Sequence, residues 1–349
     1  MPSSTITTPQ LFEGEEFNRL NEIFINLTGK KVKKIIFPGL KNRNKNGSGS
    51  AIIVTENNFK AVLTYRNNIN EAKLETEVLE RLSSHGANVP GLIAKKGNWL
   101  VQEHIEGVRL SKALTNGNMT DKLDLVRKAV ESLREIQIIG YNLNLNKLTN
   151  PISTGLNWRR GRINFPEKLG VNIQIPAPKL DDSALNDVLN INPDTFIKWD
   201  ARSGNAILNA RKQLFWFDWE HSGTRNSLDD LVWFFGDEWM PLNPNILSDL
   251  IDEVIKGFDM DKNYKKKKRY LIIHGTLHMC GRLSKILKHK GSKGWWKREY
   301  CLEFDQMGIT KTEASILSMR IATLAELDNL TKPISDWSKK IHDKIITLK

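Results

Sequence analysis

Three polar side chains near the middle of the chain have the types and spacing of a phosphoryl transfer site. Asp200 and Asn205 stand five residues apart in a polar turn after an apolar segment, and Asp218 follows the next apolar segments. Mg²⁺-dependent phosphoryl transfer places one aspartate near the acceptor hydroxyl and an asparagine and a second aspartate on the metals, with D-x-x-x-x-N as the first spacing. We therefore expect residues 196–220 to form a hairpin that carries this chemistry. Asp and Asn are also common turn formers, so the first pair alone leaves both roles open.

Composition places few restrictions on the chain but excludes several classes of protein. Its 349 residues suffice for two domains or one two-lobed enzyme with a sizeable core. The two cysteines, Cys280 and Cys301, lack metal-ligand spacing, which argues against a zinc site or disulfide framework and suits a reducing cytosol. No apolar run reaches the roughly 18 residues of a membrane span, and Met1–Gln10 lacks a secretory pattern, so a cytoplasmic location is predicted. A net charge of +12 favours anionic partners.

The chain has strand periodicity in its first part and helix periodicity in its second, and these elements must position Asp200, Asn205 and Asp218. Strands are expected at 32–37, 51–55, 59–65, 92–95 and 99–102, and helices at 13–27, 69–84, 121–138, 227–239, 245–257, 270–288, 312–330 and 335–348. Thr120 is the expected N-cap of the helix at 121–138. Segment 142–178 is irregular and rich in proline, which favours functional insertions or short helices. The change from strands to helices predicts an N-terminal lobe, 1–104, and a helical lobe, 105–349.

This order of elements and motifs resembles the aminoglycoside phosphotransferase and choline kinase-like family, which are small-molecule relatives of protein kinases. The likeness is greatest in Ile197–Leu208 and Trp216–Glu220, and Asp229–Leu231 is similar to the Asp-Leu pair that follows in the family. The resemblance implies an α+β, bilobal, kinase-like fold with a five-stranded antiparallel sheet and one helix before a mostly helical lobe. It also implies ATP and Mg²⁺ as cofactors, and as acceptor a hydroxyl of a small molecule such as a sugar, a sugar conjugate or an amino alcohol.

The resemblance assigns roles to the residues of the central segment. Asp200 would be the base or orienter for the acceptor hydroxyl, and Asn205 and Asp218 would hold Mg²⁺ against the ATP phosphates. Arg202 beside the base could neutralise phosphate charge or pair with a neighbouring acid. Glu220 could assist at the metal or bond within its own loop.

The nucleotide side departs from the family at one position. The family places a lysine on a strand to grip the phosphates and to pair with a glutamate on the next helix; Glu75 matches the glutamate, but Thr64 stands at the lysine position. Since side chains alternate along a strand, Lys60 and Arg66 share a face with Thr64 and could supply the charge. Both could equally be solvated edge charges. If neither reaches the phosphates, the chain is a weak nucleotide binder or a pseudokinase.

Two further stretches are expected beside the nucleotide. The loop 41–50 stands where a phosphate-covering loop belongs, and Gly47 and Gly49 would permit close backbone approach to an anion. Taken alone, the loop is a flexible basic hairpin tip. Glu103, His104 and Ile105 should form the hinge, where backbone groups would meet the adenine edge.

The acceptor should lie between the Asp200 turn and the helices after Asp218. Trp233, Asp237 and Glu238 are candidates to line it, the acids by attracting an amine. Further candidates are Trp239, His274, His278, Trp295 and Trp296. Core packing is the alternative for the tryptophans and histidines, and no third ligand accompanies the two histidines to make a metal site.

A basic run, Lys265–Arg269, leaves one more function open. It could contact nucleic acid or an anionic membrane surface, although such runs usually form solvated helix starts and no nucleic-acid motif accompanies it. The sequence thus favours a small-molecule kinase that binds a nucleotide and a hydroxylated acceptor. The alternatives are a nucleotide-binding pseudokinase and a kinase-fold protein that engages a polyanion.

Overall fold

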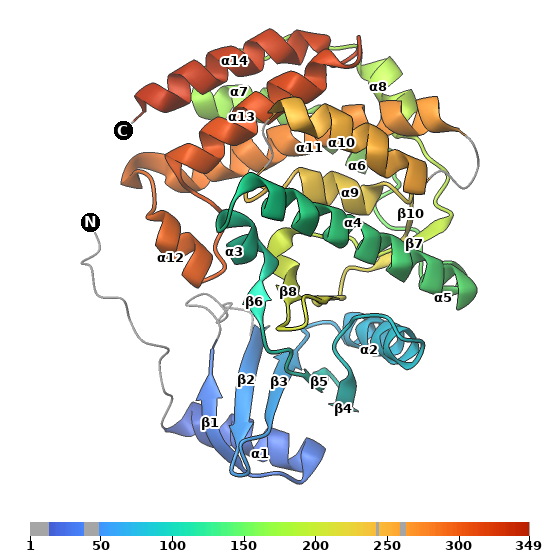
Figure 1. Cartoon of the computed structure of the whole chain (residues 1–349), viewed down its shortest axis with the longest axis vertical. Helices are drawn as coiled ribbons and strands as arrows, with labels where there is room; N and C mark the ends of the chain where they lie inside the picture. Colours follow the sequence, from blue (N-terminus) through green and yellow to red (C-terminus); the bar gives the residue numbers. More distant parts are fainter. Residues whose placement is uncertain (1–13, 38–48, 242–243, 259–262, 349) are drawn as a thin grey trace. The chain divides into compact units, whose positions relative to one another are not determined.

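A computed structural model describes residues 14–37, 49–241, 244–258 and 263–348 (Figure 1). The chain folds into two compact units, and one later segment of the chain returns to the first unit. The first unit contains Met1–Gly107 and Phe215–His221, and the second contains Val108–Leu214 and Ser222–Lys349. Asp218 therefore packs with the first unit, whereas Asp200 packs with the second. The predicted lobes, 1–104 and 105–349, did not include the return of Phe215–His221. The boundary after residue 104 stays a prediction of where the functional domains divide.

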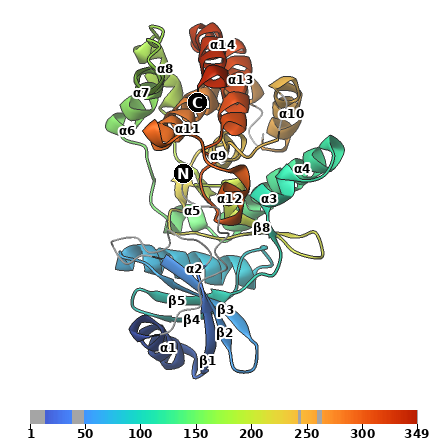
Figure 2. The ribbon, with the colours of Figure 1, turned by 90° about the vertical axis from the view of Figure 1, so that its left-hand side faces the viewer.

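The first unit is a five-stranded antiparallel sheet with a helix on each face, as Figure 2 shows. In sheet order the strands are β1 (Val32–Ile36), β2 (Gly49–Thr55), β3 (Lys60–Tyr65), β5 (Trp99–Glu103) and β4 (Leu92–Lys96). Alternating apolar residues of β1, β2 and β3 bury one face under Leu20 and Phe24 of α1 (Glu15–Thr28). The opposite face meets α2 (Ile69–Ser84), toward which Gln102 of β5 donates a hydrogen bond. The predicted sheet is confirmed.

The second unit is built around one long buried helix. Its helices are α3 (Leu110–Thr115), α4 (Met119–Asn142), α5 (Leu145–Leu148), α6 (Leu156–Ile163), α7 (Phe165–Ile173), α8 (Asp182–Leu189), α9 (Asp229–Phe235), α10 (Pro244–Gly257), α11 (Tyr264–Lys290), α12 (Arg298–Glu303), α13 (Lys311–Glu326) and α14 (Lys332–Thr347). α11 is buried over most of its middle because α7, α9, α10 and α13 pack around it (Figure 1). The short helices expected within 142–178 are present as α5, α6 and α7.

Short strands in the second unit hold the predicted catalytic segment. β7 (Thr195–Ile197) pairs with β10 (Gly223–Arg225), and β6 (Val108–Arg109) pairs with β8 (Ala206–Leu208). A 3₁₀ turn, Ser203–Asn205, precedes β8, and β9 (Leu214–Trp216) follows it. The hairpin expected from the strands on either side of the Asp200 turn does not form, because β7 pairs with β10, beyond the segment, and not with β8.

The observed N-cap of α4 differs from the predicted one. Asn118, rather than Thr120, caps the helix: its side chain accepts a hydrogen bond from the backbone N–H of Asp121 at 2.9 Å. Thr120 lies within the first turn.

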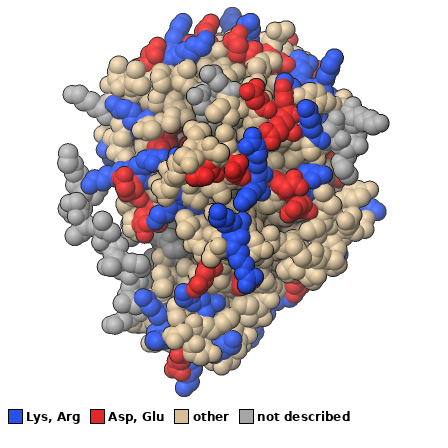
Figure 3. Space-filling model, in the orientation of Figure 1, with Lys and Arg blue, Asp and Glu red and all other residues tan. Residues whose placement is uncertain are grey.

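Charge is mixed over the surface. Figure 3 shows Lys and Arg interspersed with Asp and Glu on the visible face. Within the basic run, Lys268 pairs with Asp252 at 2.5 Å and Arg269 with Asp328 at 2.9 Å. These bonds suit a solvated helix start. In the described part of the chain, no helix has the length and apolarity needed to cross a membrane.

Candidate active site

The Asp200 loop is held in a strained backbone conformation by a buried carboxylate. Trp199 and Asp200 have φ values of 57° and 47°, in the left-handed region that costs a non-glycine residue about 1–2 kcal/mol. Asp230, fully buried on α9, accepts the backbone N–H groups of Lys198 at 3.1 Å and Trp199 at 2.8 Å. Burial raises the pKa of Asp230 to about 6, against the hydrogen bonds that favour its charged form. The Asp-Leu pair noted in the sequence thus anchors the loop.

Asp200, Arg202 and Asn205 meet at one point. Arg202 Nε donates to Asp200 Oδ1 at 2.8 Å, and Asn205 Nδ2 donates to Asp200 Oδ2 at 3.0 Å and to the Asp200 carbonyl at 2.9 Å. Burial opposes the charge of Arg202, but Asp200 and Asp305 outweigh it and raise the Arg202 pKa. Because the Asn205 amide nitrogen makes both bonds, its amide oxygen has the chemistry to ligate a cation.

Two supports of this loop had no signal in the sequence. Arg109 of β6 donates to the Gly204 carbonyl at 2.5 Å and pairs with Asp305 at 2.9 Å. A Cβ at Gly204 would lie 2.7 Å from Asp305 Oδ1, so only glycine leaves room for this contact. Arg109 and Asp305 are separated by 196 positions, and no local pattern links them.

In the first unit, one arginine joins three carboxylates. Arg66 donates from Nε to Glu75 at 2.6 Å, from Nη2 to Glu75 at 2.9 Å and to Asp218 at 2.9 Å, and from Nη1 to Glu220 at 2.9 Å. Burial opposes the charge of Arg66, but Glu75, Asp218 and Glu220 outweigh it and raise the Arg66 pKa. We call Arg66, Glu75, Asp218 and Glu220 the carboxylate cluster. Arg66 thus fills the place of the expected lysine as the partner of Glu75.

The carboxylate cluster has the composition of a cation site. One guanidinium faces three carboxylates, so two negative charges remain, and burial followed by the charge of Asp218 raises the pKa of Glu220. Asp218 has a φ of 64°, and its side chain is 32% exposed while Glu75 is fully buried. Among the residues that the structure describes, no three His, Cys, Asp or Glu side chains form a complete metal cage. Asp218 is the most exposed of the three carboxylates, and its oxygens have the chemistry to ligate a hard cation.

The other candidates on the nucleotide side lie elsewhere. Lys60 is exposed and pairs with Glu106 at 2.7 Å, away from the carboxylate cluster. Thr64 is buried and shares a hydrogen bond with Ser50 at 2.9 Å. Gly47 lies outside the described residues, and Gly49 begins β2 opposite Tyr65.

The predicted hinge follows β5 directly. The Glu103 backbone N–H bonds to the Gly91 carbonyl at 2.8 Å, and its carboxylate accepts the Gly91 N–H at 3.2 Å. Ile105 is buried. Burial, together with the charge of Lys60, lowers the pKa of His104, which lies between Glu103 and Ile105.

The predicted acceptor acids are engaged within the second unit. Asp237 accepts hydrogen bonds from the backbone and hydroxyl of Ser203 at 2.7 and 2.5 Å, so it supports the Asp200 loop. Glu238 binds Arg282 through two bonds of 2.5 and 2.8 Å, and this pairing outweighs burial and lowers its pKa to about 2. Burial and the neighbouring Glu238 raise the pKa of Asp237. Trp233 is half-buried with its ring 5.4 Å from that of Trp199.

The two histidines are core residues of α11. His274 Nδ1 lies 3.0 Å from Asp229 Oδ1 and 3.1 Å from the Tyr270 hydroxyl. His278 packs against Trp233 with ring centres 4.5 Å apart. Burial lowers the pKa of both histidines, although the bond to Asp229 acts against it at His274.

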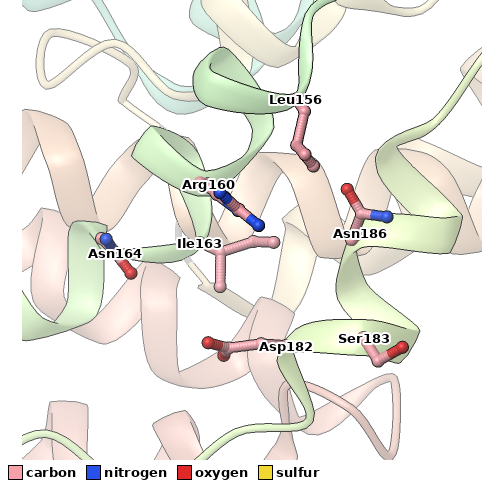
Figure 4. Close-up of a pocket in the computed structure, with 7 residues that line it drawn as sticks. All are labelled: Leu156, Arg160, Ile163, Asn164, Asp182, Ser183 and Asn186. Carbon is pink, nitrogen blue, oxygen red and sulfur yellow. The ribbon is translucent and has the colours of Figure 1, made fainter.

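A cavity of about 430 Å³ lies between α6 and α8 (Figure 4). Its polar lining includes Arg160, Asn164 and Asp182, none of which the sequence singled out. Trp158 and Arg162 lie on the same helix, α6, but are not among the residues that line this cavity.

The described fold is similar to solved structures of small-molecule kinases. Spectinomycin phosphotransferase, APH(9)-Ia, in complex with ADP and spectinomycin, matches with a TM-score of 0.52 at 12% identity, over 88% of this chain and 97% of that chain. Choline kinase from Cryptosporidium parvum Iowa II matches at 0.49 and 13%, over 88% and 93% of the two chains. LicA in complex with AMP matches at 0.48 and 14%, over 90% and 100%. No protein-family model matches the chain, and no curated protein matches its sequence. The first of these structures confirms the predicted kinase-like α+β fold.

Proposed function

We propose that the protein is an ATP- and Mg²⁺-dependent phosphotransferase that acts on a hydroxyl of a small molecule. The observation that carries the proposal is the buried bond between Arg66 and Glu75, with Asp218 on the same guanidinium. In protein kinases, a lysine paired to a glutamate of the first lobe's helix and an aspartate on Mg²⁺ must both be in place, and here Arg66 makes the pair with Glu75. The replacement of the usual lysine by Thr64 therefore does not remove the cation from the site. The fold match to a phosphotransferase solved with ADP supports the same conclusion.

The residues fit Mg²⁺ and nucleotide phosphates. The Asp218 carboxylate and the Asn205 amide oxygen each have the chemistry of a Mg²⁺ ligand, and bound Mg²⁺ would neutralise charge on the transferred phosphoryl group. Arg66 holds Glu75 and Asp218 in place, and its pairing fixes the orientation of the Asp218 carboxylate.

In this proposal Asp200 orients the acceptor and takes its proton. The donors Arg202 and Asn205 hold both carboxylate oxygens in a fixed plane, and the Trp199–Asp200 backbone is fixed by Asp230. In the transfer, the acceptor oxygen bonds to the γ-phosphorus, the bond to the bridging oxygen breaks to release ADP, and the hydroxyl proton passes to Asp200. Positioning and charge stabilisation supply most of the rate in this chemistry.

The test is ADP release from Mg-ATP with a panel of hydroxyl compounds. Asp200→Asn removes the base and is expected to lower kcat about 10²- to 10⁴-fold. Asp218→Asn should raise the Mg²⁺ concentration required for half-maximal rate. Asp336→Asn, at a carboxylate that is 85% exposed, is the matched control and should leave both quantities unchanged. Turnover that survives Asp200→Asn would refute the proposed site.

The second candidate is a nucleotide-binding pseudokinase, and the buried Thr64 at the usual lysine position favours it. In that case Mg-ATP would raise the Tm of the protein although no hydroxyl compound releases ADP. Thr64→Lys would then be expected to restore some turnover. Measurable turnover by the unchanged chain rejects this candidate.

A further inference from the structure

The excess positive charge of the chain lies in one segment. Residues 262–298 contain 13 Lys and Arg side chains and no Asp or Glu, whereas the rest of the chain has 39 basic and 40 acidic side chains. Within the described residues this segment forms α11, the 3₁₀ turn Gly291–Lys293 that follows it, and the connection to α12 (Figure 1). Because the middle of α11 is buried, most of the charge lies at its two ends.

The two ends of α11 differ in how far their charge is paired. At the first end, Lys268 and Arg269 form ion pairs with acids. At the second end, four lysines make no ion pair with any residue that the structure describes: Lys288, Lys290, Lys293 and Lys297. The negative end of the helix dipole suits cations in the last turn of α11, but Lys293 and Lys297 lie beyond that turn. The second end therefore carries charge that neither ion pairs nor the helix dipole account for.

Aromatic side chains stand among these lysines. Trp295 and Trp296 are half-buried, and Tyr300 is 37% exposed. Lys290 Nζ lies 5.3 Å from the Trp295 ring centre, so basic and aromatic side chains are neighbours here. Complete burial of the two tryptophans in the core, which the sequence left open, is not observed. We call residues 288–300, in which Glu299 is the only acid, the basic aromatic segment.

An anionic lipid bilayer matches both kinds of side chain in the basic aromatic segment. Lysines near such a surface are attracted to the charged lipid headgroups. Trp and Tyr prefer the headgroup level, where the ring meets the acyl chains and its polar atom stays hydrated. Such a contact would be peripheral, since no helix within 14–37, 49–241, 244–258 and 263–348 is long and apolar enough to cross a membrane.

Single-stranded nucleic acid is another polyanion that binds basic and aromatic side chains together, and its bases stack on ring faces. In the basic aromatic segment, Lys290 lies over the Trp295 ring. The rings of Trp296 and Tyr300 meet edge to face, with centres 5.9 Å apart and planes at 73°. These contacts occupy ring faces, whereas insertion among lipid headgroups requires only exposed ring edges. The segment therefore suits a bilayer better than a nucleic acid.

We propose that the basic aromatic segment docks the protein on an anionic lipid bilayer. In this arrangement Trp295, Trp296 and Tyr300 lie at the headgroup level, and the four lysines lie beside the lipid phosphates. The inference does not depend on the proposed phosphotransferase function, because it uses none of the residues assigned to phosphoryl transfer. It also places the membrane contact at the second end of α11 and not at the run 265–269.

The test is cosedimentation of the full chain with vesicles of phosphatidylcholine, either alone or mixed with phosphatidylglycerol. At low salt the mixed vesicles should bind at least about 10-fold more protein than the neutral vesicles. Binding to the mixed vesicles should fall as salt rises, because salt screens the attraction between exposed charges. Equal binding to both kinds of vesicle, or binding to neither, overturns the inference.

Variants locate the contact. Glutamine at all four positions, Lys288, Lys290, Lys293 and Lys297, should weaken binding to the mixed vesicles at least about 100-fold, since each lysine contributes about 5-fold. Arginine at the same four positions keeps the charge and should retain the binding, which separates loss of charge from misfolding. Tyr300→Ala should weaken binding a few-fold, because it removes apolar area from the interface.

The matched control is glutamine at Lys265, Lys266, Lys267 and Lys268. It removes the same charge from the same helix, and it should change vesicle binding less than about 5-fold. Equal losses in the two glutamine variants would overturn the inference, because net charge and not the basic aromatic segment would then determine binding. A loss confined to the variant at 288–297, with binding retained by the arginine variant, supports it.

A single-stranded oligonucleotide decides between the two polyanions. At physiological salt it should bind more weakly than the mixed vesicles. If it binds more tightly, and its binding is lost with the same four lysines, the segment is a nucleic-acid surface and the inference is overturned.

Discussion

Asp229→Asn should destabilise the second unit strongly at neutral pH and by roughly 1 kcal/mol less at pH 3. Asp229, at the start of α9, is fully buried and accepts hydrogen bonds from Arg225 Nε at 2.5 Å and from the Tyr270 hydroxyl at 2.6 Å. Arg225 is fully buried as well. Replacing the carboxylate by an amide leaves the guanidinium without its counter-charge, and breaking a buried pair in this way costs about 3–5 kcal/mol.

The pKa of Asp229 gives the pH-dependent part of this cost. Burial opposes its ionisation, but Arg225 and then His274 outweigh burial and lower the pKa from 3.8 to about 2. The difference between these two pKa values corresponds to roughly 2 kcal/mol of stability at pH 7. Because the folded-state pKa is lowered, this stability is present above the unfolded value near 4 and is lost as pH falls through about 2. About half of it should be gone at pH 3.

The assay is urea unfolding, followed by tryptophan fluorescence, at several pH values between 7 and 3. The difference in free energy of unfolding between the unchanged chain and Asp229→Asn should shrink by roughly 1 kcal/mol over this range. Asp336→Asn, at an exposed carboxylate, should differ from the unchanged chain by less than about 0.5 kcal/mol at every pH. A difference for Asp229→Asn that stays constant from pH 7 to pH 3 would refute the assigned pairing.

Three further predictions concern packing, thiols and surface charge. Gly140→Ala should lower Tm, because its Cβ would lie 2.7 Å from Phe196 Cδ1 and overpacking costs about 1–3 kcal/mol; an unchanged Tm contradicts this contact. Cys280 and Cys301 should react with a thiol reagent only after unfolding, since both are buried and burial raises both thiol pKa values, that of Cys301 to about 11; rapid labelling of the native chain would argue against this burial. Glutamine in place of all five residues of Lys265–Arg269 should leave heparin retention at low salt nearly unchanged, because members of the run already pair with acids; a large loss would instead support a polyanion-binding function.

Local periodicity predicted most elements but not their distant partners. The helix at 69–84 was predicted with its observed bounds, because the spacing of its apolar face is a local signal. The helix at 227–239 is shorter, Asp229–Phe235, since Asp237 turns back to bond Ser203. The pairing of β7 with β10 was missed because nothing in either short strand specifies the other.

The candidate site shows the same limit. D-x-x-x-x-N indicated Asp200 and Asn205 because that spacing is local, and the structure places them in direct contact. Alternation along β3 offered Lys60 and Arg66 equally, and only the packing of α2 distinguishes them: Glu75 meets Arg66, whereas Lys60 is exposed. Arg109 and Asp305, which support the Asp200 loop, were missed because 196 positions separate them.

The return of Phe215–His221 to the first unit determines when that unit can finish folding on the ribosome. Arg66 and Asp218 are 152 residues apart, and Glu75 accepts the Trp219 N–H across 144 residues. Until the segment 215–221 has left the exit tunnel, the buried pair of Arg66 and Glu75 lacks its other partners and part of its cover. The sheet and the helices can form early from local contacts. The carboxylate cluster forms only when the long stretch of chain between Arg66 and Asp218 closes into a loop, and contacts between such distant residues slow folding. A fragment ending at residue 107 would therefore lack this cluster, whereas one that also carries residues 215–221 through a short linker would have all of its residues.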